Sequence, residues 1–132
     1  MPGSPATDAG SVYIFNLASA TPTIPVHTVN NPTPNTFELF GNSIGLSGTR
    51  LVVGAHYDDS LPGTGGSAYV YDLAGPTPTV PVVTLHSTAS NRFGLSVAIS
   101  GTKVAVGAYF DDTGAADSGA AYVFDVGSGT PA

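Results

Sequence analysis

Short alternating runs of apolar and polar residues, bounded by glycine, proline or polar turns, dominate the chain. The first run is GSVYIFNL at residues 10–17, and it returns as GSAYVYDL at 66–73 and as GAAYVFDV at 119–126. Alternation with a period of two, rich in β-branched and aromatic residues, is typical of β-strands. Glycine or proline interrupts every window long enough for a helix. The pattern therefore predicts an all-β chain.

Two further runs carry a proline: IPVHTV at 24–29 and VPVVTL at 80–85. Proline has no backbone N–H to donate to a ladder and is confined to the edges of sheets. Pro25 and Pro81 therefore predict strands at a sheet edge.

The longest repeated stretch begins with a Phe-Gly pair. The first copy reads FGNSIGLSGTRLVVGAHYDD at 40–59, and the second reads FGLSVAISGTKVAVGAYFDD at 93–112. The two copies start 53 residues apart and are identical at more than half of their positions. Each copy contains two short strands joined at Ser-Gly-Thr, where glycine supplies the positive φ of a tight hairpin. A period of about fifty residues in a β-rich sequence indicates a propeller or a solenoid array. Each repeat is thus predicted to have four strands. The first begins with Phe-Gly and the second ends in Val-Gly-Ala. The third carries Tyr-Val-Phe-Asp, and the fourth carries proline.

The order of these motifs resembles the FG-GAP repeat of the integrin α-chain propeller and its bacterial relatives. The resemblance rests on Phe40-Gly41, Phe93-Gly94, Gly54-Ala55, Gly107-Ala108 and three copies of the third-strand motif. It implies four-stranded antiparallel β-propeller blades, with the first strand lining the axis and the fourth strand outermost. It also implies a non-catalytic extracellular module that acts as an adhesion or ligand-binding scaffold.

This assignment divides the chain into three parts. Residues 10–39 hold the third and fourth strands of a first blade, 40–92 hold a complete blade, and 93–132 hold the first three strands of a further blade. Closed propellers have about four to eight blades, so we expect completion by further repeats or by other copies of the chain. A closed homo-oligomer would contain three or four chains. The alternative is a structural protein that self-assembles into rings or filaments by exchanging strands between subunits.

Charge and composition narrow the classes of partner. Nine acidic residues against three basic ones give a net charge of −6, so the chain cannot neutralise a phosphate track and nucleic acid is excluded. Cysteine is absent, which excludes disulfides and thiolate metal sites. Membrane insertion is not expected, because no apolar run approaches the roughly 18 residues of a span. Abundant Thr, Gly, Ser and Pro suit an extracellular or cell-surface protein. The first ten residues lack the basic and apolar regions of a signal peptide, so an exported protein would be a mature fragment.

Clustered carboxylates occur at equivalent positions in the two long copies. They are Asp58-Asp59 and Asp111-Asp112, with Asp117 close to the second pair. Calcium takes several oxygen ligands, so these residues are candidates for a calcium site. The alternative is a turn in which Asp side chains accept backbone N–H groups, and recurrence in both repeats favours it. The acidic calcium loop that integrin-type blades carry between their first two strands is replaced here by Ser-Gly-Thr, so that site does not carry over.

Enzyme chemistry finds no support in the motifs. His27, His56 and His86 have no equivalents across repeats and no zinc-binding spacing. Residues 41–45 read Gly-Asn-Ser-Ile-Gly, but the Gly-x-Ser-x-Gly nucleophile elbow needs a strand-to-helix turn, and no helix is predicted. Glu38, the sole glutamate, has no partner carboxylate and is expected to be solvated. We therefore predict that the chain is not an enzyme.

The third strands carry a second repeated feature. Each ends in a polar residue, and because Asn16 stands where the other copies have Asp72 and Asp125, we expect a hydrogen-bonded corner. Aromatic residues alternate along the same strands. Packing between adjacent blades explains them without a ligand and is favoured over stacking on sugars. These aromatics are Tyr13, Phe15, Tyr69, Tyr71, Tyr122 and Phe124.

Overall fold

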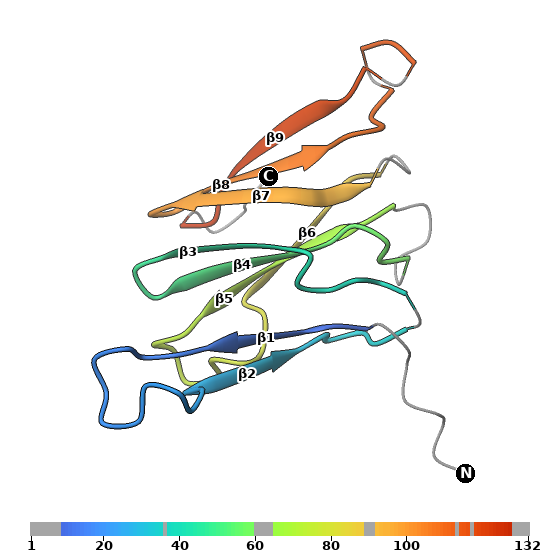
Figure 1. Ribbon diagram of the computed structural model, residues 1–132. Helices are drawn as coiled ribbons and strands as arrows, with labels where there is room; N and C mark the ends of the chain where they lie inside the picture. The colour runs from blue at the N-terminus through green and yellow to red at the C-terminus, as the bar shows by residue number, and fades with distance from the viewer. Residues whose placement is uncertain are drawn as a thin grey trace.

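The computed structural model describes residues 9–35, 37–59, 65–88, 92–112, 114–116 and 118–127. This described part of the chain contains β-strands and no helix. The strands form three antiparallel sheets that follow one another in chain order (Figure 1). The prediction of an all-β fold built from antiparallel blades is confirmed.

Each sheet keeps its strands in sequence order, so there are no crossovers within a sheet. The second sheet has the four strands predicted for a complete repeat. The first sheet contains β1 (Ser11–Ile14) and β2 (His27–Asn30); the second contains β3 (Ser43–Ser47), β4 (Arg50–Ala55), β5 (Ser67–Asp72) and β6 (Val83–His86); the third contains β7 (Phe93–Ser100), β8 (Lys103–Ala108) and β9 (Ala120–Asp125).

The sheets are stacked face to face, with β3–β6 between the other two (Figure 1). The first strands of the second and third sheets lie side by side, and the Ser43 hydroxyl on β3 donates to the Gly94 carbonyl on β7 at 2.8 Å. This is the arrangement of consecutive propeller blades, and the described strands do not close into a ring.

The two predicted hairpins are present. Ser47 pairs with Arg50 in the β3–β4 hairpin, and Ser100 pairs with Lys103 in the β7–β8 hairpin. Each turn has glycine at its first central position with φ near +60° (+58° for Gly48), as in a type II′ turn whose twist matches the strands.

The proline-bearing strands occupy the predicted edge but are shorter than predicted. β2 begins at His27 and β6 at Val83, so Pro25 and Pro81 both precede their strands. In both sheets the chain approaches through one backbone hydrogen bond just after the proline, such as Val82 N–H to the Val70 carbonyl at 2.8 Å. The ladder thus starts only where every residue has an N–H to donate.

The hydrophobic core lies between the sheets. Along β5, Tyr69 and Tyr71 face the first sheet, whereas Ala68 and Val70 face the third. One cluster joins the first and second sheets and the other joins the second and third. The first contains Val12, Val29, Phe40, Leu51, Val53, Ala55, Tyr69 and Tyr71; the second contains Val52, Ala68, Val70, Leu85, Phe93, Val104, Val106, Ala108 and Val126.

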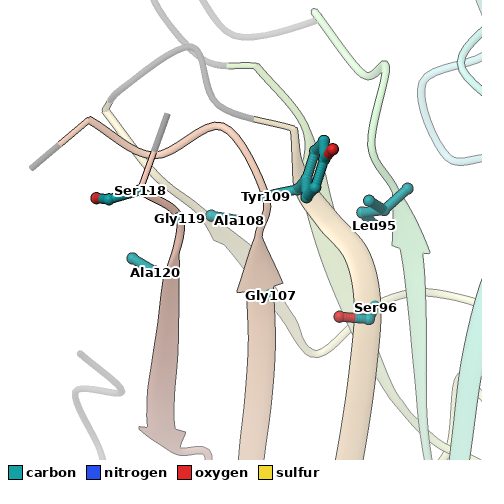
Figure 2. Close-up of a pocket in the computed structure, with 8 residues that line it drawn as sticks. All are labelled: Leu95, Ser96, Gly107, Ala108, Tyr109, Ser118, Gly119 and Ala120. Carbon is teal, nitrogen blue, oxygen red and sulfur yellow. The ribbon is translucent and has the colours of Figure 1, made fainter. Parts of the chain in front are cut away.

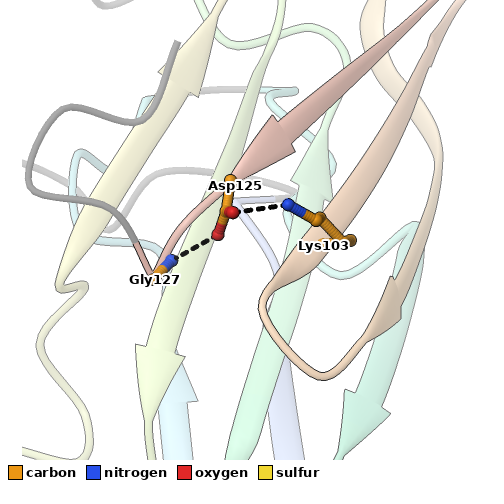
Figure 3. A network of polar contacts seen from close by, with 3 residues as sticks. All are labelled: Lys103, Asp125 and Gly127. Carbon is orange, nitrogen blue, oxygen red and sulfur yellow. Dashed lines mark hydrogen bonds and ion pairs between the residues drawn. The ribbon is translucent and has the colours of Figure 1, made fainter.

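The predicted corner at the end of each third strand is confirmed. The side-chain oxygen of Asn16, Asp72 or Asp125 accepts the backbone N–H two residues later, at 3.0–3.1 Å. In the third sheet the same carboxylate also pairs with Lys103 at 2.5 Å (Figure 3). Hydrogen bonds from Lys103 and from the Gly127 N–H hold the pKa of Asp125 below its usual value. Both side chains are well exposed, so the pair is a surface feature.

Candidate functional site

One end of the stack gathers the connections that carry the candidate residues. We call it the loop end: residues 30–42, 56–59 with 65–66, 87–88 with 92–94, and 109–119 as far as they are described. β4 and β8 end there and β5 and β9 begin there, so both Asp pairs lie on the same side of the molecule (Figure 1). The repeat thus places equivalent loops next to each other.

The first Asp of each pair is buried and is part of the fold. Asp58 and Asp111 are 1% and 0% exposed. A carboxylate oxygen of Asp58 accepts the Tyr69 hydroxyl, and a carboxylate oxygen of Asp111 accepts the Tyr122 hydroxyl. A buried carboxylate is tolerated only when donors satisfy it, and the third strand provides that donor in both sheets.

The backbone of the same two residues closes the loop. The Asp58 N–H donates to the Ala55 carbonyl at 3.0 Å, and the Asp58 carbonyl accepts the Gly66 N–H at 3.0 Å. The corresponding bonds recur at Asp111, at 3.2 Å and 3.0 Å. The loop is therefore fixed at both of its ends by one residue.

The calcium candidates are divided by this arrangement. Asp59 and Asp112 are exposed, and Asp117 lies outside the described residues. Within the described ranges, no group of three or more His, Asp or Glu side chains is placed to hold a metal ion. The calcium assignment stays a prediction.

Glu38 is not solvated, and that expectation is wrong. It is 1% exposed and accepts hydrogen bonds from the Asn31 side chain at 2.5 Å and from the Asn35 N–H at 2.9 Å. The chain folds back here through left-handed backbone at Phe37 (φ +67°) and Leu39 (φ +56°). The run of Asn residues around a single acid was the available signal, but only the reversal of the chain makes it a buried network.

Thr33 connects this network to the Asp58 loop, because its Oγ1 lies 3.1 Å from the Tyr69 hydroxyl. Glu38 and Asp58 therefore both hold the loop end of the second sheet in place. Neither carboxylate is presented to solvent.

Exposed aromatic side chains surround the buried anchors. Tyr57 is 46% exposed and Tyr109 is 61% exposed, and Phe110 lies beside Tyr109 with ring centroids 4.5 Å apart. The Arg92 guanidinium lies 4.2 Å from the centre of the Tyr57 ring and 5.5 Å from that of Phe110. Arg92 thus bridges the loops of two adjacent blades through cation–π contacts. We call Tyr57, Arg92, Tyr109 and Phe110 the aromatic cluster.

Sequence reasoning missed this cluster, although it weighed the aromatics of the third strands. The available signal was the aromatic dipeptide before each Asp pair, His56-Tyr57 and Tyr109-Phe110. Third-strand aromatics do pack between sheets at Tyr69, Tyr71, Tyr122 and Phe124, as expected. In the first sheet, however, Tyr13 and Phe15 are exposed at 57% and 47%.

His56 lies beneath the cluster and is 6% exposed. Burial, and secondarily the nearby charge of Arg92, lower the pKa of His56. Its Nδ1 has no hydrogen-bond partner within the described part of the chain. The imidazole is therefore neutral at pH 7 and packs against Tyr57, with ring centroids 4.5 Å apart.

A pocket of about 310 Å³ opens beside the cluster on the third sheet (Figure 2). Small residues at the end of β8 and the start of β9 form its floor, and Tyr109 stands at its rim. Its lining consists of Leu95, Ser96, Gly107, Ala108, Tyr109, Ser118, Gly119 and Ala120.

Two segments of the chain match the family model of the FG-GAP repeat, residues 34–71 and residues 87–124. No curated protein matches the chain. In the described residues no helix is long and apolar enough to cross a membrane. The two matched segments cover the first three strands of the second and third sheets except for the last residue of each third strand, and they cover more than half of the sequence. The chain therefore belongs to the FG-GAP repeat family.

Proposed function

We propose that this chain is a non-catalytic, extracellular β-propeller-type module that serves as an adhesion or ligand-binding scaffold. The aromatic cluster supports the proposal, because it gathers exposed rings and a cation on one end of a rigid stack. Tyrosine offers a large contact area at low conformational cost, and Arg is common at binding surfaces. The ligand would be a protein or a glycan that stacks on Tyr57 or Tyr109 and accepts hydrogen bonds from Arg92.

The base of the cluster is preorganised. Asp58 and Asp111 fix the loops by side chain and backbone, and the Glu38 network fixes the linker next to them. A surface that is rigid before binding loses less entropy when a ligand arrives. This favours recognition by the loop ends over recognition by the exposed corners at the other end of the strands.

The buried acidic groups of this end argue for binding over catalysis. A general acid or base must reach the proton that it transfers. Asp58 and Asp111 are committed to tyrosine hydroxyls and Glu38 to Asn31 and Asn35. The exposed groups of the aromatic cluster are aromatic rings and a guanidinium, which are suited to binding a ligand.

The proposal is tested by screening the purified chain against an immobilised glycan panel and a panel of extracellular matrix proteins. We expect saturable binding that Arg92→Ala and Tyr109→Ala weaken by at least about tenfold, as for residues at the centre of an interface. Tyr13→Ala is the matched control, because Tyr13 is similarly exposed but lies on the first sheet. The proposal would be rejected if none of the three substitutions weakened binding, or if the chain bound nothing in either panel.

A second candidate function is self-assembly by strand exchange, with three or four chains in a closed homo-oligomer. The observation that favours it is that β1 pairs only with β2, and β9 only with β8, among the described strands. Unpaired strand edges are templates for another chain. Light scattering after size exclusion gives the absolute mass, and deletion of residues 119–132 should change it. A particle of unchanged mass would count against strand exchange.

A further inference from the structure

His56 is buried beneath the aromatic cluster with one ring nitrogen unsatisfied. Its side chain is 6% exposed, and its Nδ1 has no hydrogen-bond partner among the described residues. It directly follows β4, and its ring packs on Tyr57 with centroids 4.5 Å apart. A neutral imidazole leaves only an uncharged polar atom without a partner in this position.

A proton on His56 would create a poorly compensated buried charge. In an imidazolium both ring nitrogens are donors, so Nδ1 would carry an N–H with no acceptor within the described part of the chain. A buried charge without a partner costs far more free energy than a buried neutral group. Burial lowers the pKa of His56 for this reason, and the positive charge of Arg92 lowers it further. Protonation therefore favours a rearrangement that removes the neighbouring cation.

The ionisable groups around His56 come from its own loop, from β6 and from the third sheet. On its own loop, the Asp58 carboxylate accepts the Tyr69 hydroxyl and Asp59 is exposed. Residues 60–64 and 89–91 contain no ionisable side chain. The remaining groups of these segments are Tyr57, His86, Arg92, Tyr109, Asp111 and Asp112. Arg92 is the one whose charge shifts the pKa of His56.

Arg92 is also the residue that joins the two loops. Its guanidinium lies 4.2 Å from the centre of the Tyr57 ring and 5.5 Å from that of Phe110. Its backbone is left-handed, with φ of +57°. This conformation is uncommon for residues other than glycine and persists only where the surroundings hold it. The cation–π contacts are part of those surroundings, so a second cation beside Arg92 would weaken what holds it.

We propose that His56 is a pH-dependent switch of the aromatic cluster. With a neutral imidazole, Arg92 lies on Tyr57 and bridges the second and third sheets. When His56 takes up a proton, repulsion between the two cations moves the Arg92 side chain from Tyr57 into solvent, and the bridge opens. The cluster would then hold a ligand at neutral pH and release it in acid. This last consequence rests on the proposed scaffold function, whereas the switch itself does not.

The third sheet provides a comparison within the same chain. Tyr109 stands 53 residues after His56, and Phe110 stands 53 residues after Tyr57. Neither side chain of the third-sheet pair titrates near neutral pH. The substitution His56→Tyr therefore gives the second sheet the non-titrating residue that the third sheet has at this position.

The test is a proton NMR titration of the whole chain from about pH 8 to about pH 4.5, a range that spans the ordinary pKa of histidine. The chain has three histidines and two arginines, so the relevant signals are few. The ring current of Tyr57 should displace the δ-protons of Arg92 from the position of a solvated arginine. We expect this displacement to be lost as the pH falls, with the same midpoint as the ring protons of His56. Circular dichroism over the same range should show the chain folded.

Two variants and one control separate the switch from other titrations. His56→Tyr should make the Arg92 displacement independent of pH. Arg92→Met should raise the midpoint of His56, because linkage makes the effects of two sites on each other reciprocal. His86→Tyr is the matched control, because His86 is an exposed histidine on β6, and it should leave the Arg92 transition unchanged.

The proposal is overturned if the Arg92 signals stay displaced after His56 has titrated, or if they move with a different midpoint. It is also overturned if folded His56→Tyr keeps the transition, or if Arg92→Met leaves the midpoint of His56 in place. If His56→Tyr does not fold, the Arg92→Met titration decides. These measurements use no ligand, so a failure of the scaffold function in the binding panels is recognised separately.

Discussion

Removing one hydroxyl from each of two neighbouring tyrosines should change stability in opposite directions. Tyr69 and Tyr71 lie two residues apart on β5, face the first sheet and are 3% and 0% exposed. The Tyr69 hydroxyl donates to the buried Asp58 carboxylate and lies 3.1 Å from Thr33 Oγ1. The Tyr71 hydroxyl has no hydrogen-bond partner among the described residues, and burial raises the pKa of this phenol.

The expected magnitudes follow from these partners. A hydrogen bond to a charged group contributes about 1.5–3 kcal/mol to stability, so Tyr69→Phe should lower the free energy of unfolding by about 2 kcal/mol. An unsatisfied buried hydroxyl costs at least about 1 kcal/mol, so Tyr71→Phe should raise the free energy of unfolding by about 1 kcal/mol. Phenylalanine fits this environment, because the counterparts of Tyr71 in the other sheets are Phe15 and Phe124.

Equilibrium unfolding in urea, followed by far-ultraviolet circular dichroism, measures both variants without depending on tyrosine emission. Tyr122→Phe is a useful third variant, because its hydroxyl also donates to a buried Asp but is itself only partly buried. It should destabilise less than Tyr69→Phe. If Tyr71→Phe destabilises as much as Tyr69→Phe, the hydroxyl of Tyr71 has a partner and the reasoning fails. If Tyr69→Phe is neutral, the carboxylate does not anchor its loop through this bond.

Three other predictions concern the loop end, the sheet interface and the surface. Burial lowers the pKa of His56, so as the pH falls the unfolded chain takes up a proton on His56 before the folded chain does. The free energy of unfolding should therefore fall as the pH drops below about 6.5. In urea titrations, His56→Tyr should flatten this part of the pH profile. Gly66→Ala should destabilise by at least about 3 kcal/mol through overpacking and backbone strain, whereas Gly101→Ala, with open space around its Cβ, should cost only about 1 kcal/mol in thermal unfolding. Lys103→Met should leave the urea midpoint unchanged within error, because its pair with Asp125 is solvent-exposed; a clear shift would contradict the surface role.

The sequence was sufficient to predict the antiparallel strands and their turns, because each local motif occurs in more than one copy. Two copies of Ser-Gly-Thr predicted two hairpins, and both are present with glycine at positive φ. Asn16 in place of Asp predicted a hydrogen-bonded corner, and the bond is present in all three sheets. These features depend on residues close in sequence, so a local pattern specifies them.

Features that depend on how the chain folds back, and not on a local motif, were not predictable in this way. The sequence shows Asp58 and Asp59 as one acidic pair, but the first is buried against a tyrosine and the second is exposed. Glu38 was expected in solvent because it is a lone acid in the linker without a partner carboxylate. Its donors come from Asn31 and Asn35 only after the chain reverses through two left-handed residues. Backbone reversal at non-glycine residues has no reliable sequence signal.

Burial in a stacked architecture is decided by the neighbouring sheet, and this limits what any single repeat can reveal. Val70 and Val123 occupy the same position in the same motif, yet one is fully buried and the other is 66% exposed. Gly66 and Gly119 likewise share a motif and a positive φ, but only Gly66 receives the carbonyl of a following Phe. A residue in such a repeat therefore has the side chain and backbone conformation that packing against a neighbouring sheet requires, whether or not a described residue makes that contact.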